Sequence, residues 1–500
     1  MKRGIIVILA VAGVLALGGC GKGTQEEFLG EKIENRAFFP VPQESFVGDP
    51  MPFYDEGKFQ VFFLDDLRDG QQGYHPWSLY ATENLYEYEY VKEVIPFGAS
   101  SENQDLALGT GSVIKDSEGV YHAFYTGHND VPREDKPKEA IMHAVSTDLK
   151  KWDKIPEDTF DGSETYSAND FRDPYVVYVE EKQEYWMLIT TRKDEQGVIV
   201  KYTSKDLKEW KDEGIFFEND MGTDSNLECP TLLQYKNKWY LFFSDQWPER
   251  IVHYRVSDTV DGKFECPKRD SFDADGFYAG RAETDGKNLY LFGWNGTKDT
   301  YTDDGKYAWA GNLVVHQLIQ NEDGTLTVSP VEAISKQLNH EIAVKPVEKT
   351  KSIKAKKEYY SFSGDGREEL VFGKLKGNYQ IKGKIISADE GKFGFTFGLP
   401  EELTEGALGS LNFVFDKENN QIAFYNTSDL ENTEPQSVNT LNLQEEGEIS
   451  FTILISDSVV SLYIEEQCVI TARMYEVQQK MWGIFGEDAS IRISDLEVYK

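Results

Sequence analysis

Cysteine, histidine and methionine are scarce in this sequence, whose 500 residues contain four, seven and seven of them. Beyond the N-terminal segment, Cys229, Cys266 and Cys468 stand far apart, so their spacing indicates neither a disulfide framework nor a zinc site. The histidines are scattered as well and are never paired at ligand spacing. We therefore predict no metal site and no cofactor.

Positive charge is also in short supply, because 52 basic residues face 87 acidic ones and leave a net charge of −35. Such a field repels phosphate backbones and anionic lipid, which disfavours nucleic-acid binding and a membrane-surface role through basic residues. The chain is instead rich in aromatic residues (13%) and glycine (42 residues), which suits short strands and turns better than a helical bundle. The length predicts two or three domains.

The N-terminus contains an apolar run, Ile5 to Leu17, that follows a short basic start. As a helix this run rises only ~20 Å, too little to cross a ~30 Å hydrocarbon core comfortably. It ends in Leu-Gly-Gly-Cys, which resembles the lipobox of bacterial lipoproteins. The resemblance implies a signal peptide over residues 1–20, lipidation of Cys20, and an extracytoplasmic, membrane-anchored protein. Residues 21–37 then form a polar tether; the alternative is an ordinary signal peptide or an uncleaved anchor.

A hairpin-like pattern of turn residues followed by an aromatic strand recurs along the first two thirds of the chain. The copies lie at 54–63, 115–125, 181–189, 236–243 and 285–292. A second signature, Ser146–Trp152, recurs 58 residues later as Ser204–Trp210. Units of about four strands at this spacing are typical of a β-propeller, so we predict five blades over residues 38–340. A long array of β-sandwiches is the alternative.

The last third of the sequence carries a different pattern. Six lysines fall between 345 and 357, which indicates a Lys-rich connector over residues 341–358. Alternating strands such as Phe393–Phe397 and Leu411–Phe415 follow without helical periodicity. The predicted fold is therefore all-β: a five-bladed β-propeller followed by a C-terminal β-sandwich over residues 359–500.

Three acidic residues stand just before repeated hairpins: Asp49, Asp173 and Glu228. Each lies about thirty residues before the next turn signature, so we expect equivalent positions in three blades, at the mouth of one central channel. Gly111-Ser112 occupies the corresponding place in the second blade. A glycosidase needs two such carboxyl groups, one as nucleophile or base and one as proton donor. The alternative is that Asp-Pro and Glu-Cys-Pro are turn residues at the blade entry.

The segments Gly48-Asp49-Pro50, Arg172-Asp173-Pro174 and Glu228-Cys229-Pro230, together with Thr471–Tyr475, resemble glycoside hydrolase family 32. This is the family of invertases, inulinases and levanases. The resemblance implies a retaining hydrolase of β-fructofuranosyl linkages that takes an oligo- or polysaccharide substrate and no cofactor. It assigns Asp49 as the nucleophile and Glu228 as the general acid/base. Asp173, fixed by Arg172, holds the sugar hydroxyls and stabilises the transition state.

The sequence departs from the family pattern around the nucleophile. The family has Asn where this chain has Gly48, Asn-Gly where it has Met51-Pro52, and a sugar-binding Gln where it has Leu64. The expected catalytic residues are thus present, but the neighbouring residues that would recognise the sugar differ from those of the family. The residues predicted to bind substrate are Arg172, Asp65, Asp66, Trp77, Ser112, Cys229 and Trp294. For Trp77, packing within the blade is the alternative to stacking on a sugar.

Two further functions stay open at this stage. A family 43-like inverting arabinosidase or xylosidase shares the propeller and the three acids. A surface lipoprotein that binds glycans without cleaving them would also fit these differences. The two enzyme mechanisms differ in the separation of the carboxyl groups and in the anomer first released.

Overall fold

The computed structural model describes residues 31–32, 37–68, 74–134, 136–162, 165–387, 391–402, 408–442, 447–465 and 467–500. The predicted signal peptide, Cys20 and most of the predicted tether lie outside these residues. Within the described parts of the chain, no helix is both long and apolar enough to cross a membrane.

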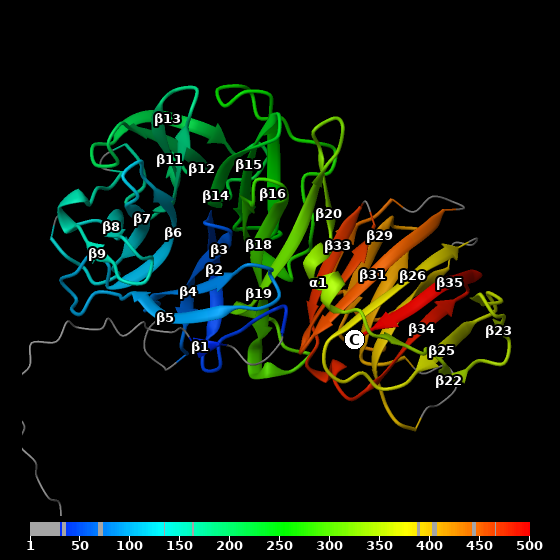
Figure 1. Cartoon of the computed structure of the whole chain (residues 1–500). Coiled ribbons are helices and arrows are strands. Elements are labelled where there is room, and N and C mark those ends of the chain that lie inside the picture. The colour runs from blue at the N-terminus through cyan, green and yellow to red at the C-terminus, as the bar shows by residue number, and fades with distance from the viewer. Residues whose placement is uncertain are drawn as a thin grey trace, which may run out of the picture.

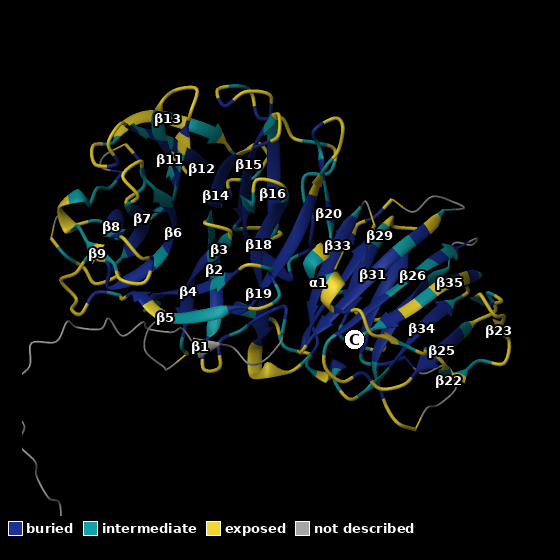
Figure 2. Ribbon diagram, in the orientation of Figure 1, coloured by how far each residue is buried: buried dark blue, intermediate teal, exposed yellow. Residues whose placement is uncertain are grey.

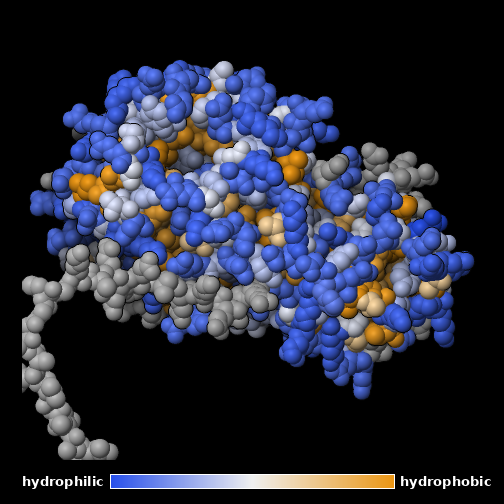
Figure 3. Space-filling model, viewed as in Figure 1, coloured by the Kyte–Doolittle hydropathy of each residue, from blue (hydrophilic) through white to orange (hydrophobic). Residues whose placement is uncertain are grey.

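The described chain is all-β and forms two units that lie side by side (Figure 1). The N-terminal unit comprises β1–β20 and the C-terminal unit β21–β35, with the short helix α1 (Glu332–Gln337) between them. Hydrophilic residues cover most of the face seen in Figure 3, as the acidic composition requires.

The N-terminal unit contains five successive strand groups. The first is β2 (Phe46–Asp55), β3 (Lys58–Asp66), β4 (Trp77–Thr82) and β5 (Glu89–Ile95), with β1 (Glu31–Lys32) paired to β5. The second is β6 (Ala107–Lys115), β7 (Tyr121–His128), β8 (Glu139–Ser146) and β9 (Asp153–Lys154). The third is β10 (Phe171–Val179), β11 (Glu184–Lys193), β12 (Gln196–Ser204) and β13 (Lys211–Glu218). The fourth is β14 (Leu227–Tyr235), β15 (Lys238–Asp245) and β16 (Val252–Ser257), and the fifth is β17 (Phe277–Thr284), β18 (Leu289–Lys298), β19 (Tyr307–Gln320) and β20 (Leu326–Ser329).

All five predicted hairpins are confirmed as the first strand pair of a group: β2–β3, β6–β7, β10–β11, β14–β15 and β17–β18. The sheets do not close into a barrel. The first and fifth groups share one nine-stranded sheet, joined where Val47 of β2 pairs with Gly311 of β19. The last strand group of the N-terminal unit is therefore joined to the first.

The first strands of the five groups contact one another in a cycle: β2–β6, β6–β10, β10–β14, β14–β17 and β17–β2. Side-chain alternation explains this stacking, because successive residues of a strand face opposite sides of its sheet. In β3, Phe59 and Val61 join the apolar core shared with the fifth group, whereas Phe62 and Leu64 join the core shared with the second. Each sheet is thus buried on both faces, as the dark interior strands in Figure 2 show.

The second repeated signature proves to be a turn. The Ser146 hydroxyl accepts hydrogen bonds from the backbone N–H groups of Asp148 and Leu149, and the Ser204 hydroxyl does the same one group later. Trp152 packs edge-on against Phe62 within the shared core. The repeat therefore encodes the connection from the third to the fourth strand of a group.

The C-terminal unit consists of two sheets around one apolar core. The first sheet is β23 (Lys354–Ala355), β24 (Tyr359–Ser361), β35 (Ile491–Tyr499), β26 (Tyr379–Ser387), β31 (Glu448–Ser456), β32 (Val459–Ile464) and β33 (Cys468–Arg473), with β21 (Glu341–Ile342) paired to β35. The second is β22 (Pro346–Lys349), β25 (Arg367–Phe372), β34 (Met481–Glu487), β27 (Lys392–Leu399), β28 (Leu411–Asp416), β29 (Gln421–Tyr425) and β30 (Ser437–Thr440).

The stretch 341–358 differs from the expected Lys-rich connector. Three short strands, β21, β22 and β23, lie within it and pair with strands of the C-terminal unit. Backbone pairing holds the stretch against the sheets while its lysines remain on the surface. The stretch therefore contributes to the sheets of the C-terminal unit.

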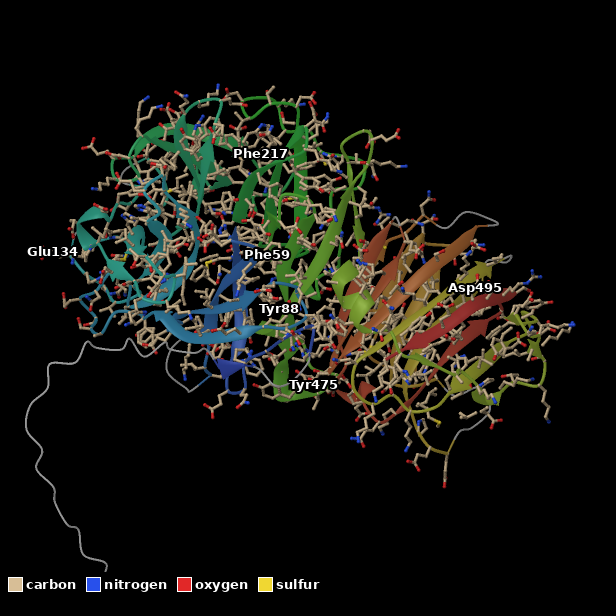
Figure 4. All side chains as sticks on the ribbon, viewed as in Figure 1. Phe59, Tyr88, Glu134, Phe217, Tyr475 and Asp495 are labelled. Carbon is tan, nitrogen blue, oxygen red and sulfur yellow. The ribbon has the colours of Figure 1, made fainter. Side chains whose placement is uncertain are left out.

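Arg473 fixes the C-terminal unit to the N-terminal one. Its buried guanidinium donates to the backbone carbonyls of Asn295 (2.8 Å) and Gly296 (3.1 Å) on β18, and to the hydroxyl of Ser458 (2.9 Å). Tyr475, labelled at the boundary between the units in Figure 4, accepts the backbone N–H of Lys298. The end of β18 is thus held by the neighbouring unit.

We expect Arg473→Ala to destabilise the whole protein, because it removes the hydrogen bonds that a buried guanidinium donates to two carbonyls of the neighbouring unit. The expected loss of unfolding free energy is about 2–4 kcal/mol, measured by denaturant titration. Arg492→Ala is the control, since Arg492 is exposed and its guanidinium lies over the ring of Tyr359; its expected cost is below about 1 kcal/mol. Equal losses for the two variants would contradict the proposed role of Arg473 in joining the two units.

Candidate active site

Each of the five first strands carries a β-bulge near its start. The pairing register shifts between Gly48 and Met51, Leu108 and Gly111, Arg172 and Tyr175, Glu228 and Thr231, and Tyr278 and Arg281. Four residues at the bulges have positive φ: Asp49 (39°), Asp173 (59°), Cys229 (53°) and Ala279 (52°). Bulges bend a strand and re-aim its side chains, and they are frequent beside active sites.

The bulges show that the predicted equivalence of the three acids is off by one residue. Asp49 and Asp173 do occupy equivalent positions, but their equivalent in the fourth group is Cys229, and in the second it is Gly109. Glu228 is equivalent to Arg172 instead. Because the bulge re-aims consecutive side chains, both positions still face the same cavity. The predicted convergence is right, and the assumption of strict equivalence is wrong.

The three acids line one cavity of about 520 Å³. Asp49, Asp173 and Glu228 come from three different strands and contribute its carboxyl groups together with Glu139 of β8. Its other lining residues are Leu64, Ala107, Leu108, Gly109, Thr110, Thr126, His128, Arg172, Cys229, Gln246, Arg250, Tyr278 and Trp309. Residues up to 260 positions apart in the sequence thus form a single concave site.

Within the described residues, Asp49 accepts side-chain hydrogen bonds from neutral donors only. The indole Nε1–H of Trp294 donates to Oδ1 (3.0 Å) and the hydroxyl of Thr110 to Oδ2 (3.2 Å). Burial raises the pKa of Asp49 to about 7; the Trp294 hydrogen bond opposes this increase, and the charges of Asp173 and Glu228 add to it. Trp294 was predicted to bind substrate, and it orients the nearby carboxylate instead.

Glu228 is held at both of its oxygens. Arg172 donates to Oε1 through Nη2 (2.9 Å) and Nε (3.3 Å), and the phenol of Tyr278 donates to Oε2 (2.6 Å). Tyr278 occupies the same bulge position as Glu228 and Arg172, on the first strand of the fifth group. Two fixed donors leave this carboxyl group a defined orientation toward the cavity.

Asp173 is buried beside the other two acids. Its Oδ2 accepts the backbone N–H of Cys229 (3.0 Å), and its own N–H donates to the hydroxyl of Thr126 (2.9 Å). Burial raises the pKa of Asp173, the charge of Arg172 opposes this, and the charge of Glu228 supports it. Arg172 was expected to fix Asp173, but within the described residues its guanidinium donates to Glu228, Glu139, Asp170 and Gln246. Arg172 acts on Asp173 through its positive charge, which opposes the increase in the pKa of Asp173.

Five predicted substrate-binding residues lie outside the cavity lining: Trp294, described above, and Asp65, Asp66, Ser112 and Trp77. Asp65 is fully buried and accepts hydrogen bonds from Ser78 and Tyr90, and Asp66 pairs with the guanidinium of Arg68. Ser112 accepts the backbone N–H of Val176 and thereby ties β6 to β10.

Trp77 is fully buried and donates to the backbone carbonyl of Gly109 (3.0 Å), so packing is the correct reading. Its indole therefore ties β4 to the second strand group and does not reach the cavity.

Trp309 is a cavity residue that the sequence reading missed. A Cβ atom added to Gly48 would stand 2.4 Å from its indole, so only glycine at position 48 leaves room for this ring. Arg68 donates to the Trp309 carbonyl (2.6 Å), and the ring of His75 lies 4.6 Å away, centroid to centroid. Of the altered positions, Leu64 lines the cavity and Gly48 lies against Trp309, which lines it too. Met51 is buried and lies outside the lining.

A second group missed from the sequence surrounds Arg172. The carboxylate of Glu139 accepts from Arg172 and from the backbone N–H of Phe171, and its other oxygen lies 3.3 Å from Nδ1 of His128. This hydrogen bond, against the effect of burial, raises the pKa of His128. No motif marks Glu139 or His128, because their place depends on where β7 and β8 meet the third group.

The arrangement has the parts of a two-carboxyl displacement. Asp49 accepts hydrogen bonds from Trp294 and Thr110 and forms no ion pair within the described residues, which suits a nucleophile. Glu228 is oriented by two donors and lies across the same cavity, which suits proton transfer. Asp173 lies beside both and accepts hydrogen bonds.

Comparison with known proteins agrees with this geometry. The family model for the glycosyl hydrolases family 32 N-terminal domain matches residues 41–330, and that for a GH32, BT1760-like, C-terminal domain matches residues 324–498. The raffinose invertase of Escherichia coli is 23% identical over 59% of this chain and 64% of its own length. The sucrose-6-phosphate hydrolase of Staphylococcus xylosus is 22% identical over 62% and 65%. The chain thus spans just under two thirds of these relatives.

Among solved structures, the sucrose-6-phosphate hydrolase of Lactobacillus gasseri superposes with a TM-score of 0.70 at 20% identity. The match covers 93% of this chain and 92% of that one. It shows that both units, and not the N-terminal unit alone, share a known fold.

We expect Asp49→Asn to stabilise the protein at neutral pH and not at pH 4. Between its ordinary pKa of 3.8 and the folded value of about 7, Asp49 keeps a proton that the unfolded chain has lost. Stability therefore falls as pH rises across this range, and the asparagine removes the penalty. Melting temperatures at pH 4, 6 and 8 should show the variant gaining on the wild type with pH.

Asp55→Asn is the matched control, with the opposite sign. Partial burial raises the pKa of Asp55, but hydrogen bonds from Lys115 and Tyr121 outweigh it and lower the pKa. This group stabilises the fold above its ordinary pKa, so the control variant should lose stability as pH rises from acid. The same pH trend in both variants would contradict the assignment.

Proposed function

We propose, because the chain belongs to glycosyl hydrolase family 32, that it hydrolyses β-fructofuranosyl linkages of fructans or of fructose-containing oligosaccharides, with retention of configuration. The observation that carries this proposal is the convergence of Asp49, Asp173 and Glu228 on one cavity. No cofactor takes part in the proposed reaction.

In the proposed reaction, Asp49 attacks the anomeric carbon while Glu228 donates its proton to the leaving oxygen. A covalent fructosyl-enzyme forms and the remaining sugar departs. Glu228 then removes a proton from water, which attacks the anomeric carbon and releases Asp49. Asp173 accepts hydrogen bonds from ring hydroxyls as charge develops on the sugar.

We further propose that the five strand groups are the blades of a five-bladed β-propeller and that the C-terminal unit is a β-sandwich. The cyclic contacts among the five first strands support the first assignment, and the single core between two sheets supports the second. In this architecture the cavity lies at the mouth of the central channel.

For the cellular location, we propose an extracytoplasmic lipoprotein anchored through lipidated Cys20. The support is the sequence Leu17-Gly18-Gly19-Cys20 after a short apolar run. Incorporation of labelled palmitate, abolished by Cys20→Ala, tests it.

The function is tested by sugar release from sucrose, inulin, levan and arabinan. The wild type should release fructose from at least one fructosyl substrate. Asp49→Asn should lower kcat by about 10⁴-fold or more, because it removes the nucleophile. Circular dichroism of the variant serves as the folding control.

Other outcomes would support the other functions. Arabinose release with an inverted anomer would indicate the family 43-like enzyme. Binding of one glycan without release of any sugar would indicate a capture protein. Proton NMR of the first product identifies the anomer directly.

The pH profile reports on the nucleophile. On the acid side, kcat/KM should fall as Asp49 becomes protonated, with a midpoint near its pKa of about 7. Trp294→Phe keeps the ring and removes the donor that lowers this pKa, so the acid limb should move to higher pH. An acid limb that does not move would mean that another group controls it.

A further inference from the structure

The loop between β15 and β16 carries an exposed tryptophan at the edge of the cavity. Gln246 and Arg250 of this loop both line the cavity, and Trp247 lies between them in sequence. Its side chain is 36% exposed, although tryptophan is a residue that folding normally buries.

This exposed ring is nevertheless held in place. The indole Nε1–H donates to Oδ1 of Asp224 (2.9 Å), and the backbone N–H donates to the hydroxyl of Ser225 (3.1 Å). The guanidinium carbon of Arg192 lies 5.4 Å from the ring centroid. Three contacts from two neighbouring segments fix the ring and still leave part of it open to solvent.

The position of the loop relates Trp247 to the proton donor. Glu228 lies on β14, in the same strand group as the loop. Gln246 accepts from Asn226 (2.9 Å) and lies 3.5 Å from Nη2 of Arg172, the group that orients Glu228. Asp49 lies on β2, in another group. Trp247 therefore stands on the side where the leaving sugar is protonated.

We propose that Trp247 forms a binding subsite for a sugar ring beyond the cleaved linkage. An aromatic ring held rigid by its polar edge offers an apolar face to the C–H face of a sugar, at little cost in conformational entropy. Asp224, Gln246 and Arg250 supply polar groups beside that face. The inference rests on the proposed function and specifies its substrate class: fructosyl oligosaccharides of three or more units, in preference to disaccharides.

The test compares chain lengths in one variant. Trp247→Ala should lower kcat/KM about tenfold for fructosyl oligosaccharides of three to five units from inulin or levan, since one stacking contact is lost. Hydrolysis of sucrose should be unchanged, because a disaccharide does not reach the ring. Trp247→Phe should restore most of the loss. Tyr178→Ala is the matched control, an exposed aromatic at the opposite end of β10 from Asp173.

A binding measurement separates the subsite from the chemistry. In the Asp49→Asn background, calorimetry with the same oligosaccharides should give weaker binding when Trp247 is also alanine, and equal binding when Tyr178 is alanine. Equal affinity with and without Trp247, or an equal loss for sucrose and the longer sugars, would overturn the subsite. Failure of the wild type to cleave any fructosyl linkage would instead overturn the proposed function.

Discussion

The ion pair between Arg172 and Glu228 organises the site, because one buried guanidinium serves three carboxylates. Arg172 contacts Glu228, Glu139 and Asp170, and these contacts offset much of the repulsion among acids that share a cavity. Asp49 lies outside this ion-pair network and depends on Trp294 and Thr110. Glu228 thus lies beside a positive charge and Asp49 does not. Such a difference in environment is how two carboxyl groups of the same chemical type acquire different roles.

The repeated bulge is the backbone feature that brings these groups together. Without an extra residue, alternation would send every second side chain of a first strand into the neighbouring sheet. The bulge interrupts alternation at the same level in all five groups, so consecutive residues such as Arg172 and Asp173 both reach the cavity. Positive φ at Asp49 and Asp173 is unfavourable for residues with a Cβ atom, and such local strain is common at functional sites.

The sequence predicted the hairpins and the convergence of the three acids, because both depend on local patterns that repeat. It did not predict the one-residue offset of Glu228, since a bulge leaves no mark in residue type. Asp65 and Asp66 were assigned to the site because they stand beside Leu64, where the family has its sugar-binding Gln, yet Asp65 is buried against Ser78 and Asp66 pairs with Arg68. Trp309 and Glu139 reach the cavity through tertiary packing, which spacing along the chain does not encode.

The close approach of Gly48 and Trp309 has an evolutionary consequence. A lineage that regains a side chain at position 48 must first lose or rotate the indole at 309, because the two cannot occupy the space together. A side chain at position 48 is thus compatible only with a smaller or rotated residue at position 309, so the two positions should vary together. Any change of specificity that needs a side chain at position 48 therefore takes at least two substitutions, in a fixed order.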